Sequence, residues 1–164
     1  MGKITIIVAV DKQLAIGNKG DQLAYISEDL KRFKALTTGN TVVMGRKTQQ
    51  ALPKGYLPNR RNIVLSRSNI EIPNVEVMHS AEEVLSSLKA DEELYVIGGA
   101  VVYELFMNIT DAIEWTLIDY TFPEYDVIFP SINSAEWKIT SDGEWKTDEK
   151  SGYRYKYQRL ERIK

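Results

Sequence analysis

The sequence contains no cysteine and a single histidine, His79. Without cysteine the chain can have no disulfide, thiol nucleophile or cysteine metal site, and the reducing cytoplasm is the expected compartment. A single histidine nearly excludes a Ser-His-Asp triad and excludes a histidine-rich metal site. We therefore expect no bound metal ion.

Strong net charge and long apolar runs are also missing. The net charge is −2 and there is no basic run, which argues against nucleic acid as the main partner. The apolar run at residues 4–10 is too short for a signal core or a membrane span. At 164 residues and 43% hydrophobic content, the chain has the size of one soluble domain with a sizeable core. We expect a single domain over residues 1–164, acting as a monomer without a membrane partner.

Two adjacent glycines, Gly98 and Gly99, mark the most informative stretch. They follow a short apolar run at residues 94–97 and precede apolar positions at helical spacing, which predicts a strand turning directly into a helix. Glycines let a ligand approach the backbone, and a helix N-terminus attracts phosphate. The alternative is a tight turn that needs glycine only for its backbone angles. The full G-x-G-x-x-G fingerprint is absent, so both interpretations stay open here.

The rest of the chain alternates between strand and helix patterns. Alternation of this kind predicts an α/β fold in three layers, with a mostly parallel central sheet and helices on both faces. Near the C-terminus, residues 137–140 and 153–160 alternate polar and apolar side chains, which predicts antiparallel strands, the second at an edge. The other strands are expected at residues 4–10, 41–45, 62–65, 75–78, 94–97 and 112–120, and the helices at 27–37, 46–52, 80–89 and from 100.

Cations and hydroxyls follow two of the expected strands. Arg46, Lys47 and Thr48 come after one, and Ser66 and Arg67 come after the next. Ligands of open α/β sheets collect beyond the carboxyl ends of strands, where a basic residue accommodates the 2′-phosphate of NADP. NADP rather than NAD is therefore indicated. The polar loop at residues 11–21 is either a lid over such a site or a connector.

The helix expected at residues 27–37 carries a notable acid. Ser27 is its predicted N-cap, and Asp29 lies in the first turn beside the apolar face of Leu30 and Phe33. A carboxylate buried there would need a partner. Alternatively, Asp29 complements the helix dipole in solvent.

Taken in order, these motifs resemble those of a bacterial dihydrofolate reductase over essentially the whole chain. The resemblance implies NADPH-dependent reduction of 7,8-dihydrofolate to tetrahydrofolate, within one-carbon metabolism, by an enzyme that antifolates can inhibit. The matching segments are Val8-Ala9-Val10, Ala15-Ile16-Gly17-Asn18, Glu28-Asp29-Leu30, Phe33-Lys34, Val43-Met44-Gly45-Arg46-Lys47-Thr48, Leu57-Pro58-Asn59-Arg60-Arg61-Asn62, Val96-Ile97-Gly98-Gly99, Tyr103, Asp126 and Phe129-Pro130.

The resemblance also implies the site residues. Asp29, hydrogen-bonded by Thr116, would hold the pterin and promote its protonation, and Arg60 would take the glutamate carboxylate. The implied substrate residues are Ile7, Val8, Asp29, Leu30, Phe33, Lys34, Leu52, Leu57, Arg60, Ile97, Tyr103 and Thr116. The implied cofactor residues are Ala9, Ile16, Gly17, Asn18, Gly20, Asp21, Gly45, Arg46, Lys47, Thr48, Leu65, Ser66, Arg67, His79, Ile97, Gly98, Gly99, Ala100, Val101, Val102 and Tyr103.

The chain departs from the family pattern before this helix, where Gln22-Leu23-Ala24 replaces the common Leu-Pro-Trp. That change bears on the lid, the proton route and inhibitor affinity. Two other functions are weighed beside the first. One is a reductase of the same fold acting on another ring, such as a pyrimidine of riboflavin synthesis, against which Asp29 and Arg60 argue. The other is a non-catalytic nucleotide-binding module.

Overall fold

The computed structural model describes residues 2–163, which form two compact units. The first unit contains residues 2–5 and Thr37–Thr110, and the second contains Ile6–Leu36 and residues 111–163. Strand β1 (Ile4–Val10) is divided between them. The expectation of one domain over residues 1–164 stays a prediction.

The first unit is built on four parallel strands. They are β4 (Thr41–Gly45), β5 (Arg61–Leu65), β6 (Glu76–Met78) and β7 (Leu94–Val96), in the order β7-β4-β5-β6. Val42, Val43, Met44, Ile63 and Val64 are fully buried. Continuous apolar runs of this kind form strands that are covered on both faces.

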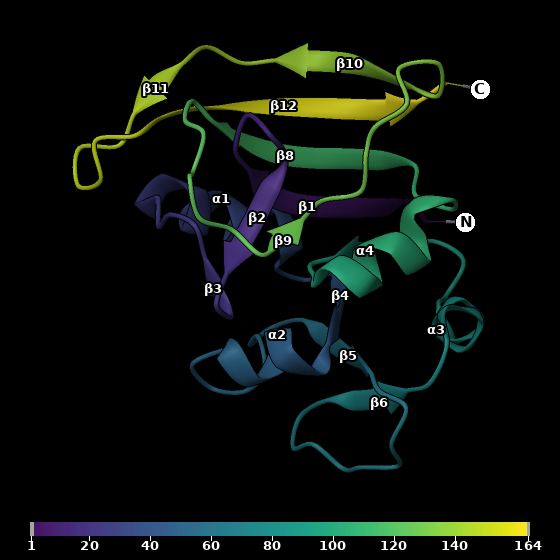
Figure 1. The fold of residues 1–164 in the computed structure, drawn as a ribbon. Helices are drawn as coiled ribbons and strands as arrows, with labels where there is room; N and C mark the ends of the chain where they lie inside the picture. Colours follow the sequence, from purple (N-terminus) through teal and green to yellow (C-terminus); the bar gives the residue numbers. More distant parts are fainter. Residues whose placement is uncertain (1, 164) are drawn as a thin grey trace. The chain divides into compact units, whose positions relative to one another are not determined.

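Three helices accompany these strands, and two of them begin at glycines. Helix α2 (Arg46–Ala51) starts where β4 ends, and α4 (Ala100–Met107) starts after Gly99. Helix α2 packs on β4 and β5, and α4 packs on β4 and β7 (Figure 1). The third helix, α3 (Ala81–Ser87), is capped by the Ser80 hydroxyl, which accepts from the Glu83 N–H at 3.1 Å, and ends two residues earlier than predicted.

The second unit contains the antiparallel strands. Strand β12 (Arg154–Arg162) pairs with β8 (Ala112–Ile118) on one side and with β10 (Trp137–Asp142) and β11 (Lys146–Thr147) on the other (Figure 1). The prediction that the last strand lies at an edge is therefore wrong. Its alternating side chains reflect the two faces of the pleat, and β10 is the edge strand. The side chains of β10 are exposed from Lys138 onward, and its pairing is interrupted by a bulge between Ile139 and Ser141.

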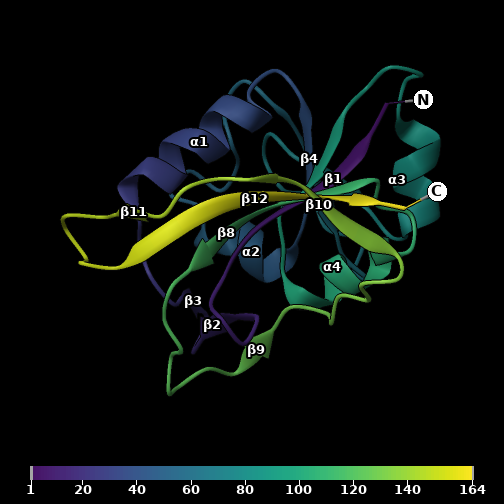
Figure 2. The same ribbon diagram turned by 90° about the horizontal axis from the view of Figure 1, so that it is seen from above.

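A small second sheet and the first helix complete this unit. Strands β2 (Ala15–Asn18), β3 (Asp21–Gln22) and β9 (Val127–Ile128) pair in the order β3-β2-β9. Figure 2 shows this sheet and α1 (Ser27–Thr37) on opposite sides of β8 and β12. The segment 11–21, which was expected to be a loop, thus contains strand residues. The loop prediction failed because β2 pairs with β9 across more than a hundred residues and both strands are too short to show alternation.

Helix α1 begins differently from the prediction. Ser27 is its first residue, and the carbonyl of Ile26 accepts the first helical hydrogen bond, from the Leu30 N–H at 3.3 Å. Ser27 contributes to the lowered pKa of the Asp148 carboxyl group, in the hairpin of β11 and β12. Ile26, and not Ser27, is therefore the N-cap residue of α1. The predicted fold class, a mostly parallel sheet with antiparallel C-terminal strands, is confirmed. None of the helices in residues 2–163 is long and apolar enough to cross a membrane.

Candidate active site

The clearest chemical feature of the second unit is a paired carboxylate. Asp29 lies in the first turn of α1, and the hydroxyl of Thr116, on β8, donates to its Oδ1 atom at 2.5 Å. Thr116 is buried and Asp29 is half-buried. Burial raises the pKa of the Asp29 carboxyl, while the Thr116 hydrogen bond and the charge of Arg32 act in the opposite direction. Of the two interpretations of Asp29, the structure supports the carboxylate with a partner.

Apolar side chains accompany this carboxylate along α1 and β1. Leu30 is 52% exposed and Phe33 is half-buried, while Lys34 is exposed. In β1, Ile7 is buried, and its neighbours Val8 and Ala9 are half-buried. A large apolar side chain that reaches solvent beside a desolvated carboxyl group is suited to a ligand that is apolar at one end and polar at the other.

The predicted lid residues lie in the hairpin of β2 and β3. The Gly17 carbonyl accepts from the Asp126 N–H, and the Asp126 carboxylate accepts from the Lys19 N–H, both at 3.0 Å. The Tyr25 hydroxyl donates to Asp21. Asp126 therefore fastens the hairpin that carries the predicted residues Ile16, Gly17, Asn18, Gly20 and Asp21.

The segment that departs from the family pattern has its own contacts. Leu23 and Ala24 are partly buried and pack against the core formed by Ile26, Ile118, Phe122 and Tyr155. In the absence of the tryptophan, this segment is therefore held to the core by the side chains of Leu23 and Ala24.

In the first unit, three glycines meet at the ends of β4 and β7. The Gly45 N–H donates to the Gly98 carbonyl at 2.9 Å, and the Gly98-Gly99 peptide bond is cis. A Cβ at Gly98 would lie 3.4 Å from the Tyr103 hydroxyl and 3.5 Å from Thr48 Oγ1. Gly98 also has φ +127°, a conformation that side chains rarely adopt. We call Gly45, Gly98 and Gly99 the glycine cradle.

Positive groups border the cradle. The N-cap residue of α4 is Gly99, which forms no side-chain hydrogen bond. The backbone N–H groups at the start of the helix, from Ala100, Val101 and Val102, therefore receive no cap from the N-cap residue. Arg46 and Lys47 open α2 and are exposed, and within residues 2–163 neither forms an ion pair with a carboxylate. Backbone N–H groups and unpaired cations around small residues fit a pyrophosphate.

The second predicted phosphate position is also assembled. Ser66 follows Leu65, the last residue of β5, and its carbonyl oxygen lies 2.7 Å from Nδ1 of His79. Both His79 and Arg67 are exposed. The structure therefore brings Ser66, Arg67 and His79 to one place, as expected for the end of β5 beside β6.

The remaining predicted residues of the first unit form an apolar wall and a fixed cation. Leu52, Leu57 and Ile97 are partly buried and pack on Val42, Met44 and Val64. Separately, Arg60 donates from Nη1 to the Thr37 hydroxyl and from Nε to the Pro58 carbonyl, both at 2.9 Å. Burial lowers the pKa of this guanidinium, but it stays charged. A guanidinium oriented in advance suits a carboxylate.

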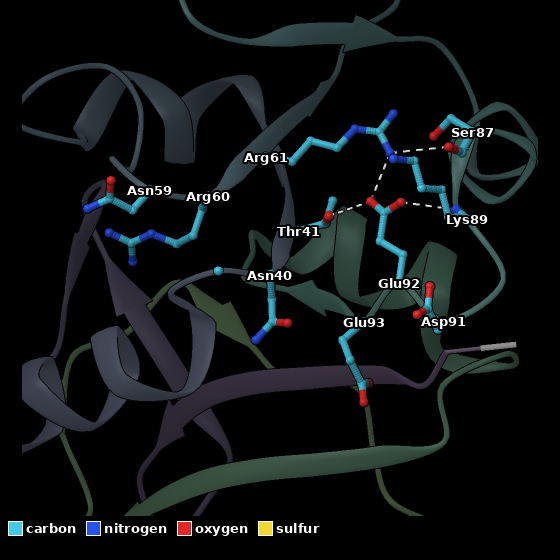
Figure 3. A pocket seen from close by; sticks show the side chains of 11 residues that line it. Asn40, Thr41, Asn59, Arg60, Arg61, Ser87, Lys89, Asp91, Glu92 and Glu93 are labelled. Carbon is cyan, nitrogen blue, oxygen red and sulfur yellow. Dashed lines mark hydrogen bonds and ion pairs between the residues drawn. The ribbon is translucent and has the colours of Figure 1, made fainter.

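A cavity of about 580 Å³ lies on the other flank of Arg60 (Figure 3). In this cavity Arg61 Nη1 forms an ion pair with Glu92 Oε2 at 2.8 Å. The same Glu92 oxygen accepts a hydrogen bond from the Thr41 hydroxyl at 2.5 Å. Figure 3 shows Arg60 pointing away from this group. Arg61 and Glu92 are already paired there, and the lining of the cavity includes none of the three glycines of the cradle, so the cavity is a different place from the glycine cradle.

Sequence reasoning missed several charged residues near Asp29. Arg32 on α1 and Arg159 on β12 both bind Glu114 on β8, each at 2.6 Å. The available signal was an acid, Glu114, inside the otherwise apolar strand pattern Ala112–Ile118. A buried carboxylate in such a pattern requires cationic partners.

Comparisons with known proteins agree with this geometry. The family model described as dihydrofolate reductase matches residues 3–162. A dihydrofolate reductase of Staphylococcus haemolyticus is 36% identical over 163 residues, covering 99% of this chain and 97% of that protein. That of Bacillus subtilis is 36% identical over 155 residues, covering 94% and 91%. The solved structure of dihydrofolate reductase from Enterococcus faecalis, complexed with NADP(H) and RAB-propyl, matches with a TM-score of 0.90 and 36% identity, covering 99% of this chain and 98% of the other.

A family model that spans nearly the whole chain, relatives of the same length and a matching fold lead to one conclusion. This chain belongs to the dihydrofolate reductase family and reduces 7,8-dihydrofolate to tetrahydrofolate with NADPH.

Proposed function

We propose that Asp29 is the residue that grips the pterin ring and promotes its protonation. The observation that carries this proposal is the Asp29–Thr116 hydrogen bond of 2.5 Å on a carboxyl group that burial keeps protonated to a higher pH than usual. A carboxyl group of this kind can form a paired, charge-assisted contact with an amino group and a ring nitrogen. It can also supply a proton at a higher pH than an exposed carboxyl group can.

The glycine cradle supports the proposed cofactor site. NADPH, when bound, supplies the hydride. The cradle, the N-terminus of α4, Lys47 and Thr48 would hold the pyrophosphate, and a Cβ at Gly98 would fill space that the backbone leaves open. Arg46, Ser66, Arg67 and His79 would surround the 2′-phosphate end, while Ala9, Ile16 and Tyr103 would frame the nicotinamide.

The remaining residues would recognise the rest of the substrate. Leu30, Phe33, Leu52 and Leu57 would wrap its aromatic middle. Arg60, fixed by Thr37 and Pro58, would bind the glutamate carboxylate, assisted by Lys34. A pyrimidine of riboflavin synthesis has no such tail, and a non-catalytic module has no need of a desolvated acid. These residues therefore favour dihydrofolate over both alternatives.

We also propose that the chain acts as a single monomeric domain in the cytoplasm and that antifolates compete with dihydrofolate for the Asp29 site. Sedimentation analysis tests the oligomeric state. Competitive inhibition that is weakened in Asp29→Asn tests the inhibitor site.

The function is tested by following NADPH absorbance. We expect NADPH to be oxidised only when dihydrofolate is added. Asp29→Asn should bind NADPH normally but turn over about 100-fold more slowly at neutral pH, with a smaller loss at acid pH, because solvent then supplies the proton. An equal loss at every pH would contradict the proton-supplying role.

Glu28→Gln is the matched control. Glu28 lies in the same helical turn, but it is exposed and binds Lys146 at 2.8 Å and the Tyr155 hydroxyl at 2.7 Å. Because the negative charge of Glu28 raises the pKa of Asp29, we expect the pH profile of Glu28→Gln to move slightly to lower pH, while its turnover at neutral pH falls far less than that of Asp29→Asn.

A further inference from the structure

One face of the second unit gathers charged groups on the side of α1 that carries Asp29. In the pairing of β8 with β12, Thr116 lies opposite Tyr157 and Glu114 lies opposite Arg159. Residues two apart in a strand share a face, so all four side chains lie on the same side of the sheet. The contacts of Thr116 with Asp29 and of Glu114 with Arg32 show that this side faces α1.

Glu114 is the centre of this group. It is 7% exposed, and its two carboxylate oxygens accept from different guanidinium groups, Oε2 from Arg32 and Oε1 from Arg159, each at 2.6 Å. We call Arg32, Glu114 and Arg159 the charge triad. A buried carboxylate with both oxygens engaged holds its two partners in fixed places.

The position of Arg32 is fixed from a second direction. Its guanidinium carbon lies 4.0 Å from the centroid of the Tyr157 ring, a cation–π contact. Arg32 is three residues after Asp29 on α1, which places both side chains on one face of the helix. The cation that shares the Asp29 face of the helix is therefore held in place by an acid and an aromatic ring.

We propose that the charge triad positions Asp29 and sets the pH range over which this carboxyl group keeps its proton. The inference rests on the proposed role of Asp29 in protonating the substrate. Arg32, Glu114 and Arg159 act through Asp29 and make no contact with the reacting atoms, so they are positioning residues.

The signs follow from the charges. Arg159 also binds Glu161 at 3.2 Å, so two cations and two anions make the whole network neutral, and each substitution changes its charge by one unit. Removing Arg32 deletes the nearby cation, so Asp29 should hold its proton to higher pH. Removing Glu114 leaves the Arg32 charge uncompensated, so Asp29 should lose its proton at lower pH. Removing Arg159, the more distant cation, should act as Arg32 does but more weakly.

The other groups around Asp29 are neutral or internally paired. Glu28, on α1, binds Lys146 of β11 and the Tyr155 hydroxyl of β12. Burial raises the pKa of the Tyr157 hydroxyl, so it stays uncharged. Thr116 carries no charge. Glu161, on β12, balances Arg159 at 3.2 Å, so Arg32 is the member of the triad whose charge acts on Asp29.

The experiment measures the Asp29 carboxyl directly, by NMR titration of the ligand-free protein labelled with ¹³C in aspartate side chains. The Asp29 signal is assigned by its loss in Asp29→Asn. We expect the pKa to rise by about half a unit to one unit in Arg32→Gln and to fall by a similar amount in Glu114→Gln. The pH dependence of single-turnover hydride transfer should move in the same two directions.

Three variants serve as controls. Lys31→Gln removes an exposed cation one residue from Arg32, and Tyr157→Phe keeps the ring under the guanidinium while removing its hydroxyl. Arg32→Lys keeps the charge. All three should titrate close to the wild type. Arg32→Gln and Glu114→Gln are each compared with the wild type separately, so either one is a sufficient test if the other does not fold.

Two results would overturn the proposal. In the first, Arg32→Gln and Glu114→Gln move the pKa in the same direction, as loosened packing would do. In the second, the pKa of Asp29 in both Arg32→Gln and Glu114→Gln equals its pKa in Lys31→Gln. Either result would leave the role of Asp29 intact if Asp29→Asn still loses turnover mainly at neutral pH. If Asp29→Asn instead loses activity equally at every pH, the proton-supplying role fails even where the NMR shifts appear.

Discussion

At the scale of single residues, the burial that suits Asp29 to its proposed role lowers the stability of the folded protein when this carboxyl group is ionised. Burial raises the pKa of this carboxyl above its ordinary value, so the folded protein binds the proton more tightly than the unfolded chain does. The stability contributed by the neutral carboxyl is fully present below the ordinary pKa of about 3.9 and is lost as pH rises through the folded value. Above the folded value the ionised, partly buried group therefore destabilises the fold.

Replacing this group should stabilise the protein without ligands. We expect Asp29→Asn to have a higher Tm than the wild type at pH 7, since the amide can still accept from Thr116 and carries no charge. The difference should narrow as the pH is lowered and the wild-type carboxyl group takes up its proton. Thermal unfolding followed by circular dichroism at both pH values checks this. A lower Tm for Asp29→Asn at pH 7 would contradict it.

The two adjacent glycines should respond differently to a methyl group. Gly98 has φ +127°, so Gly98→Ala is strained and should lose about 1–3 kcal/mol of folding free energy. Gly99 has φ −81°, and a Cβ there would meet nothing closer than 3.8 Å. Gly99→Ala should therefore fold normally yet bind NADPH more weakly, because the methyl group occupies the cradle. Denaturant unfolding and NADPH titration separate the two effects, and equal stability losses would refute this distinction.

A candidate site residue could be predicted from the sequence where the residue and its immediate neighbours form a recognisable pattern. Asp29 and the Gly98-Gly99 pair stood out because an acid beside an apolar face and glycines at a strand end are visible in the sequence. The charge triad was not predictable, because Arg32, Glu114 and Arg159 come from three separate segments and look like ordinary surface charges until the strands pair. The family resemblance supplied the roles of residues such as Arg60, which no spacing rule would have assigned.

At the scale of elements, the N-terminus of α1 depends on Asp148. Its carboxylate accepts from both the backbone N–H and the hydroxyl of Ser151, at 2.9 and 2.6 Å, and Ser27, at the start of α1, also lowers its pKa. These bonds hold the pKa of Asp148 below its ordinary value. Its contribution to stability is thus present above the ordinary pKa and is lost as pH falls through the lowered one.

Removing the Asp148 carboxylate should weaken the start of the helix that carries Asp29. We expect Asp148→Ala to lower Tm by several degrees at neutral pH and the deficit to shrink below about pH 4, as the wild-type carboxyl becomes protonated. Glu149→Ala, at an exposed neighbour, should have the wild-type Tm. A deficit that persists unchanged in acid would show that the carboxylate charge is not involved.

Elements with strong periodicity were predictable, and elements defined by distant partners were not. Strand β1 and helix α1 occupy the expected residues, since each has a continuous pattern. Strands β2 and β9 contain four and two residues and exist through pairing with each other. The place of β12 inside the sheet depends on β10 and β11, which its own sequence does not encode.

At the scale of the whole molecule, the preference for NADPH should appear as a difference in ligand-induced stability. A ligand present at 100 times its Kd stabilises a protein by about 2.7 kcal/mol. We expect NADPH to raise Tm more than NADH at equal concentration. In Arg67→Ala this difference should shrink by the equivalent of about 10- to 100-fold in NADPH affinity, because the proposed contact of Arg67 with the 2′-phosphate is lost while those of Arg46, Ser66 and His79 remain.

The control for that comparison is Arg154→Ala. It removes an exposed cation that lies over the Trp145 ring, far along the sequence from β5, and leaves the net charge equal to that of Arg67→Ala. Its NADPH response should match the wild type. If both variants lose the NADPH preference, general charge attraction and not a 2′-phosphate contact explains it.

The exposed outer strand β10 has a consequence for how the protein behaves in concentrated solution. An uncovered strand can act as a template for a strand of a second molecule, but the bulge between Ile139 and Ser141 puts the outward N–H and C=O groups out of step. Lys138 and Asp142 add charges that an incoming strand would have to desolvate. Polymerisation through this edge is therefore disfavoured, and samples at the millimolar strength that carbon-detected spectroscopy needs should remain clear.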